Sequence, residues 1–125
     1  MNKKINLSIW DREFEIYISF QNYPGEEITD LQEKTEKMIP TADINASLDF
    51  VKKYIMKYNA DDVDEKGLAN IFRCVIPKGI LIPRRNDGKR VFAIMCNYKF
   101  DMEHGIAIVF ENEKYKSIGP QDIIL

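Results

Sequence analysis

This chain of 125 residues has few cysteines, one histidine and no long apolar run. The two cysteines, Cys74 and Cys96, stand apart in apolar stretches and form neither a CxxC pair nor a multi-cysteine framework. We expect both to be buried, reduced thiols of a cytoplasmic protein. No run is long enough to cross a bilayer, and residues 1–11 lack the apolar core of a signal peptide, so we expect no membrane partner.

An excess of one charge is also missing. Lysine and arginine number 18 against 20 aspartates and glutamates, which gives a formal net charge of -2 and an isoelectric point near 5.5. This balance argues against a domain devoted to binding nucleic acid. The apolar content of 45% and the charged content of 30% are typical of globular proteins, and the length suits one domain over residues 1–125.

The common motifs of enzyme chemistry do not occur either. The sequence contains no GxSxG, no P-loop, no GxGxxG and no HExxH. Nucleophilic, nucleotide-dependent and zinc-protease chemistry therefore lack support. We predict no catalytic residue, no metal and no cofactor.

Apolar and polar residues alternate from residue 4 to residue 20, which is the period of a β-strand. The pattern predicts an antiparallel hairpin with one buried face, near an edge of the sheet. Its apolar positions are Ile5, Leu7, Ile9, Phe14, Ile16, Ile18 and Phe20.

Helical signals follow the hairpin. Thr29 and Gln32 have the spacing of a capping box, and Pro40 cannot continue a helix, so a helix is expected over residues 30–39. A second helix is expected over residues 46–58, because apolar residues recur there at helical spacing. Its apolar stripe comprises Ile44, Leu48, Val51, Ile55 and Tyr58.

The stretch from Asp61 to Pro77 is ambiguous. Apolar spacing predicts a third helix, with Asp62 and Glu65 as its capping pair and Pro77 as its end. The apolar run at residues 71–76 also fits the start of a strand. Two or three central helices are therefore expected.

After Pro77 the sequence predicts strands. Residues 90–98 and 105–110 are apolar at nearly every position, so both strands should lie in the middle of the sheet. The helices can cover one face of the sheet. The other face needs the hairpin, the C-terminal residues 122–125 or a second copy of the chain, which leaves a homo-oligomer open. We predict an α+β domain with an antiparallel sheet and a C-terminal strand meander.

The single histidine lies in "KFDMEHG", the connection between those two central strands. Asp101, Glu103 and His104 are therefore loop residues at one end of the sheet, with Gly105 available for a positive backbone angle. A small enzyme with its site in this loop is the alternative function, since an acidic neighbour can orient an imidazole. Too few partners accompany the histidine for a metal site or a triad, so we favour a turn.

Two clusters carry charge of one sign. The basic loop, residues 83–90 with Arg84, Arg85, Lys89 and Arg90, surrounds Asn86-Asp87-Gly88, which predicts a type I′ hairpin turn. We interpret its cations as solvated charges that protect a neighbouring apolar strand from aggregation, and binding of a phosphate or an acidic partner is the alternative. No aromatic residues alternate with these cations to stack on bases.

The second cluster is the acidic segment, residues 61–65. It lacks the spacing of a calcium loop and suits helix capping, or a docking patch for a basic partner. Its four acidic residues are the candidate partner-binding residues: Asp61, Asp62, Asp64 and Glu65.

Two stretches, "PGEEITDLQEK" and "CNYKFDMEHGIAIVFENEKYKSIG", resemble a family of uncharacterised bacterial domains of unknown function. The resemblance implies a single-domain cytoplasmic protein without an established active site. Some members are thought to neighbour secreted toxins as immunity proteins, so the resemblance implies a non-catalytic binding protein whose partner is a toxin domain or another protein. The positions that match the family signature are Cys96, Tyr98, Glu103, His104, Gly105, Ile106 and Ala107.

Overall fold

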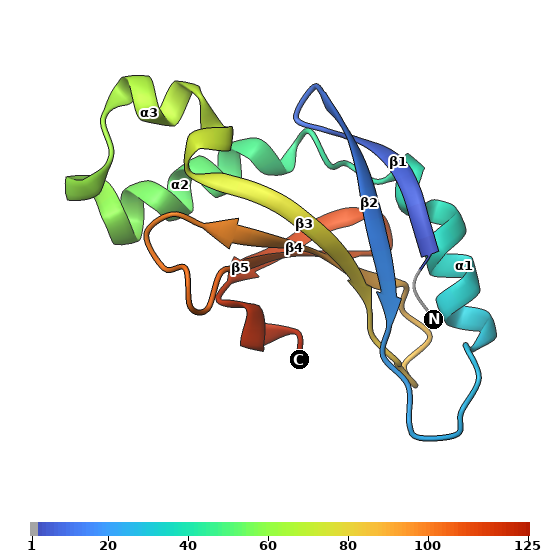
Figure 1. The fold of residues 1–125 in the computed structure, drawn as a ribbon. Helices are drawn as coiled ribbons and strands as arrows, with labels where there is room; N and C mark the ends of the chain where they lie inside the picture. The colour runs from blue at the N-terminus through green and yellow to red at the C-terminus, as the bar shows by residue number, and fades with distance from the viewer. Residues whose placement is uncertain (1–2) are drawn as a thin grey trace.

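A computed structural model describes residues 3–125, so residues 1–2 of the expected domain lie outside it. The strands form one sheet in the order β1-β2-β3-β4-β5-β6 (Figure 1). The predicted α+β class is confirmed, with an N-terminal hairpin, two main helices and a C-terminal meander. The elements are β1 (Lys3–Ile9), β2 (Arg12–Phe20), α1 (Asp30–Met38), α2 (Ser47–Asn59), α3 (Glu65–Ala69), β3 (Val75–Ile82), β4 (Val91–Tyr98), β5 (Ile106–Glu111) and β6 (Lys114–Gly119).

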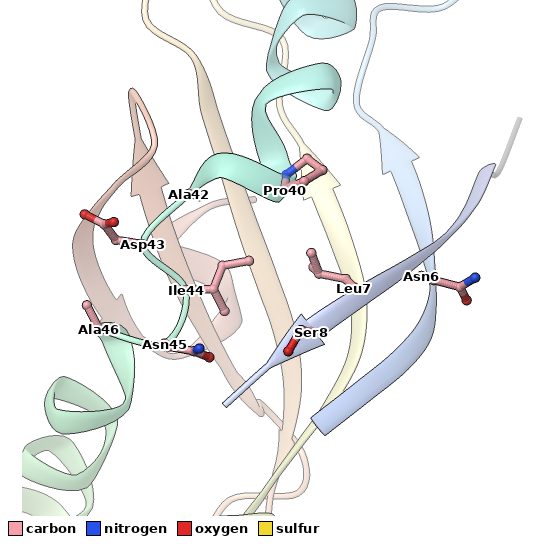
Figure 2. A pocket seen from close by; sticks show the side chains of 9 residues that line it. All are labelled: Asn6, Leu7, Ser8, Pro40, Ala42, Asp43, Ile44, Asn45 and Ala46. Carbon is pink, nitrogen blue, oxygen red and sulfur yellow. The ribbon is translucent and has the colours of Figure 1, made fainter. Parts of the chain in front are cut away.

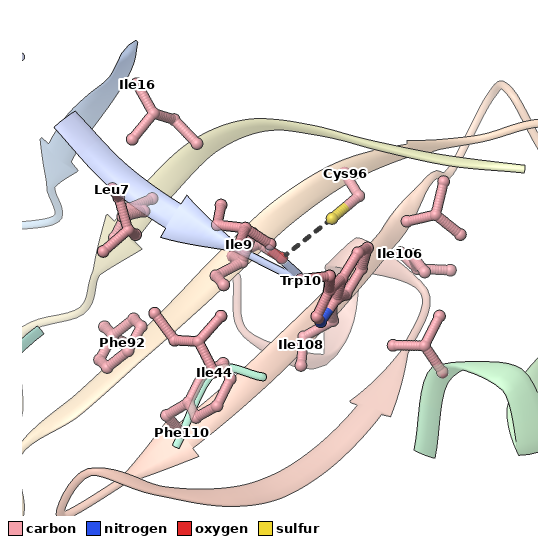
Figure 3. Close-up of a cluster of buried hydrophobic side chains, with 14 of the residues drawn as sticks. Leu7, Ile9, Trp10, Ile16, Ile44, Phe92, Cys96, Ile106, Ile108 and Phe110 are labelled. Atoms are coloured by element: carbon pink, nitrogen blue, oxygen red, sulfur yellow. Dashed lines mark hydrogen bonds between the residues drawn. The ribbon is translucent and has the colours of Figure 1, made fainter. Parts of the chain in front are cut away.

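The predicted hairpin forms, and its turn packs onto the core. Trp10 and Asp11 connect β1 to β2 with positive φ angles of 50° and 65°, which is the conformation of a type I′ turn. Trp10 is 6% exposed, and its indole N–H donates to the Ser47 hydroxyl at 3.1 Å. Figure 3 shows Trp10 beside Ile106 and Ile108 of β5, so tertiary packing holds this non-glycine turn in place.

One strand pair departs from the antiparallel pattern. β2 and β3 are parallel, with Tyr17 opposite Gly79 and Phe20 opposite Ile82. The chain between these strands contains all three helices, which is the kind of long crossover that a parallel pair requires. The sheet is therefore mixed, although its other four strand pairs are antiparallel.

The two main helices agree with their sequence signals. Gln32 N–H donates to the Thr29 hydroxyl at 3.1 Å, and Thr29 N–H donates to the Gln32 side-chain oxygen at 3.0 Å, so the capping box is confirmed. On α2, Val51 and Ile55 are fully buried. Tyr58 is 59% exposed, however, and the prediction that it continues the buried stripe is wrong.

The third helix is shorter than predicted. Its N-cap is Asp64, whose carboxylate accepts the Gly67 N–H at 2.6 Å, whereas Asp62 accepts from the Asn59 side chain. The predicted Asp62–Glu65 capping pair is therefore wrong. Pro77 does not end the element either, because β3 runs through it with a register shift between Pro77 and Gly79.

Strands β4 and β5 lie inside the sheet, as predicted, and are buried on both faces. One face meets the main core, which includes Phe92, Ile108 and Phe110 (Figure 3). The opposite face carries a small apolar cluster against which Ile124 packs. The C-terminal segment, one of the three expected covers, thus lies on the second face (Figure 1).

Candidate functional site

The loop between β4 and β5 forms a hydrogen-bonded turn. The Asp101 carboxylate accepts from the His104 backbone N–H at 3.2 Å and lies 3.0 Å from Nδ1 of the His104 ring. The Gly105 N–H donates to the Asp101 carbonyl at 2.9 Å. Gly105 has a φ of 60°, so the predicted positive angle is confirmed. The structure therefore brings Asp101 and His104 together, while the Glu103 side chain has no described hydrogen bond to either.

The pairing affects the protonation of both groups. The hydrogen bond to Asp101 raises the pKa of His104 above its usual 6.5, and the same bond lowers the pKa of Asp101. The contact with Asp101 thus favours the imidazolium form of His104, and that form is neither a base nor a metal ligand. Within residues 3–125, no three His, Cys, Asp or Glu side chains are grouped to hold a metal ion.

A cleft with a volume of about 530 Å³ lies between α2 and the residues that end β4. Tyr54 and Tyr58 from α2 line it with Tyr98 and Phe100, and Asp101 lies at its side. The ring centroids of Tyr54 and Tyr58 are 4.7 Å apart, and those of Tyr98 and Phe100 are 5.4 Å apart. The Tyr98 hydroxyl donates to Asn59 at 2.6 Å, which fixes the base of this aromatic cleft.

The acidic segment borders a second cleft, with a volume of about 430 Å³. Asp61, Asp62 and Asp64 line it together with two cations, Arg73 and Lys99. All four acidic side chains of the segment are exposed. None of the ion pairs described within residues 3–125 involves them, so none of the four has a salt-bridge partner.

The two clefts share Phe100 and therefore adjoin. Both lie where the C-terminal end of α2, α3 and the β4–β5 loop meet, at the left of Figure 1. We call this surface, which comprises the aromatic cleft and the acidic segment, the acidic-aromatic end. Sequence reasoning found its acidic half but missed its aromatic half, because the rings come from a helix and a distant strand. The i, i+4 spacing of Tyr54 and Tyr58 was the one local signal.

The basic loop differs from the acidic segment, because each of its four cations has a carboxylate partner. The Arg84–Glu26 and Arg90–Glu113 ion pairs are both 2.8 Å long. Arg85 pairs with Asp87, and Lys89 lies 3.6 Å from Glu111. The predicted type I′ turn is wrong: only Gly88 has a positive φ, and residues 83–90 form a longer connection.

A further hollow, with a volume of about 490 Å³, separates β1 from residues 40–46. Figure 2 shows Leu7 and Ile44 near its centre, while the side chains of Asn6 and Asp43 point away. Leu7 and Ile44 are core residues, and Asp43 pairs with Lys114. This hollow therefore gathers no reactive groups.

Both cysteines are free and buried, as predicted. Burial raises the pKa of the Cys74 thiol and, more strongly, that of Cys96. The thiolate form, which is the nucleophile and the metal ligand, is therefore disfavoured in both.

The comparisons with known proteins concern the whole chain. A family model described as "Domain of unknown function (DUF6985)" matches residues 1–125. No curated protein and no solved structure matches. None of the helices in residues 3–125 is long and apolar enough to span a membrane.

Much of the signature noted in the sequence has a structural explanation. Cys96 and Ile106 are buried in the core. A Cβ atom at Gly105 would lie 2.5 Å from the Cys96 carbonyl oxygen, so only glycine fits without a shift. Glu103 and His104 are the exposed members of the signature.

Proposed function

We propose a binding function for this chain, which belongs to the family described as "Domain of unknown function (DUF6985)". In this proposal the chain is a non-catalytic protein that receives a basic partner at the acidic-aromatic end. The observation that carries it is the unpaired charge of the acidic segment beside exposed aromatic and apolar side chains. Tyr58 is 59% exposed and Met102 is 67% exposed.

Protein interfaces combine a buried apolar centre with a polar rim. Tyrosine and methionine are enriched where interfaces bury most surface, and charged residues gather at the rim. Unpaired carboxylates raise the rate of encounter with a positive surface, and salt screens this effect. The acidic-aromatic end combines both features in one place.

The proposed partner is a secreted toxin domain. The resemblance to domains that neighbour toxins supports this choice, and the chain would then act in the cytoplasm as an immunity protein that covers the toxin's working surface. Such a role needs only a complementary surface and no catalytic group. Another basic protein would fit the same chemistry.

A small enzyme with its site in the β4–β5 loop is the second candidate. The 3.0 Å contact between Asp101 and His104 beside the aromatic cleft favours it. The His104 ring, however, is not among the groups that line the cleft, and Glu103 does not orient it. This arrangement fits the binding function better than acid-base catalysis.

The test starts from the product of the neighbouring gene. Its association with this protein is measured by biolayer interferometry at two salt concentrations, with wild type and with the triple variant Asp61→Asn, Asp62→Asn, Asp64→Asn. We expect the triple variant to associate more slowly, chiefly at low salt. A matched control replaces Glu13, Glu27 and Glu33 by Gln, because these exposed carboxylates lie elsewhere.

Equal association rates for both triple variants would remove the acidic segment from the interface. No binding to any neighbouring product would leave the toxin partner without support. The enzyme would be favoured instead if wild type shows a measurable turnover and the His104→Gln variant loses that turnover while its binding stays normal.

A further inference from the structure

The aromatic cleft presents several ring surfaces to one space. Four rings line it, those of Tyr54, Tyr58, Tyr98 and Phe100, and residues 118–120 with Ile123 complete its wall. Tyr54 and Tyr98 meet nearly edge to face, with centroids 5.9 Å apart. Tyr98 is 2% exposed and forms the base, whereas Tyr58 is exposed at the mouth. The volume of about 530 Å³ is large enough for one long side chain.

The residues that line this cleft carry charge of one sign only. Asp101 is the ionisable carboxylate among its lining residues, and no lysine or arginine described by the structure lines it. The acidic segment continues the negative surface across Phe100. A cation entering the cleft would therefore find the Asp101 carboxylate, which also pairs with the His104 ring, beside the aromatic rings, and no lysine or arginine in the wall.

Two of these rings already attract cations from the chain itself. The Lys57 ammonium lies 5.2 Å from the centroid of Tyr58, and the Lys99 ammonium lies 5.9 Å from that of Phe100. Neither lysine lines the aromatic cleft. The distances agree with the range of cation–π attraction, which arises from the negative face of an aromatic ring.

We propose that the aromatic cleft binds one arginine side chain of the basic partner, with the guanidinium against the exposed ring of Tyr58 and beside Asp101. The identity of the partner rests on the proposed function, but the chemistry of the cleft does not. Arginine fits better than lysine because its planar guanidinium stacks on rings and donates two parallel hydrogen bonds to a carboxylate. A purely apolar side chain would leave Asp101 without a partner from the ligand.

The experiment titrates the whole isotope-labelled protein with N-acetyl-arginine methylamide and follows the aromatic ring signals by NMR. N-acetyl-citrulline methylamide serves as the neutral analogue of nearly the same shape. We expect arginine to shift the signals of Tyr54, Tyr58, Tyr98 and Phe100. Citrulline should bind about 3- to 10-fold more weakly, the range expected for one cation–π and carboxylate contact.

Two variants test the named groups. Tyr58→Ala removes an exposed wall of the cleft, and Asp101→Asn removes the charge while keeping the oxygen that accepts the His104 N–H. Each should weaken arginine binding by about 3- to 10-fold. The controls are Tyr17→Ala, an exposed tyrosine under Lys4, and Asp43→Asn, an exposed carboxylate paired with Lys114. Thermal melts confirm that each variant is folded.

Equal binding of the arginine and citrulline probes overturns the inference. NMR shifts spread over the whole surface, or an unchanged affinity for arginine in both cleft variants, overturn it as well. If arginine binds the cleft but no basic partner exists, the proposed function fails and this inference stands. If a partner binds while the arginine probe and Tyr58→Ala have no effect, the inference fails and the proposed function stands.

Discussion

The basic loop and the acidic segment look equivalent in the sequence, but the fold treats them in opposite ways. Each cation of the basic loop has a carboxylate within an ion pair. The acidic segment has no such partner among the described residues, although Arg73 and Lys99 line the same cleft. A run of like charges therefore says little about the field that a partner meets until its tertiary neighbours are known.

Both charge clusters are carried by the same sheet, so a substitution in the core of the sheet should have the largest effect. Ile108 is fully buried in the main core, directly opposite Ile94. We expect Ile108→Ala or Ile94→Ala to lower the free energy of unfolding by about 2–5 kcal/mol, because each leaves a cavity in a packed core. Urea denaturation measures the change. A loss well below about 1 kcal/mol would contradict the core assignment.

A smaller change acts on the acidic-aromatic end alone. A Cβ atom added at Gly105 would lie 2.5 Å from the Cys96 carbonyl oxygen and 2.6 Å from Nε2 of the Gln121 side chain. The positive φ alone should cost Gly105→Ala about 1–2 kcal/mol, and the contact with the backbone adds to it. Urea denaturation of this variant is compared with Gly88→Ala, whose φ is also positive but which has open space around it. Equal losses would mean that the close approach at Gly105 is without effect.

Removing charge from the basic loop and from the acidic segment should affect stability differently. Arg90→Gln breaks the paired contact with Glu113 and leaves that carboxylate largely covered, so the melting temperature should fall by a few degrees at most. The acidic triple variant breaks no ion pair, and its melting temperature should change less. Calorimetry at low and high salt measures both. A larger loss in the triple variant would show that the acidic segment supports the fold rather than a partner.

The smallest expected effect concerns the Asp101–His104 pair. Because Asp101 raises the pKa of His104, the NMR titration midpoint of the imidazole should lie above 6.5 and return toward 6.5 in Asp101→Asn. The histidine's contribution to stability is complete below its unfolded pKa and is lost as pH rises through the folded value. The contribution of Asp101, whose pKa is lowered, is lost as pH falls through its folded value. A midpoint at or below 6.5 in wild type would contradict the pairing.

Sequence reasoning succeeded where the signal was local. The capping box at Thr29 and Gln32, the hairpin alternation and the two-sided apolar strands each appear within a few neighbouring residues. It failed at turns. Asn86-Asp87-Gly88 has the residues of a type I′ turn but forms a longer loop, whereas Trp10-Asp11 adopts that turn without glycine. The packing of Trp10 against Ser47 and Phe72 outweighs the local preference.

The α+β class, the two main helices, the central strands and the burial of both cysteines follow from the sequence, because period and capping are properties of short segments. The fold is needed to define the parallel β2–β3 pair, the aromatic cleft and which charge cluster stays unpaired. Those features join residues far apart in the chain: 58 positions separate Arg84 from Glu26, and 39 separate Tyr98 from Asn59. Electrostatic and packing energies depend on distance in space, and no local pattern carries that distance.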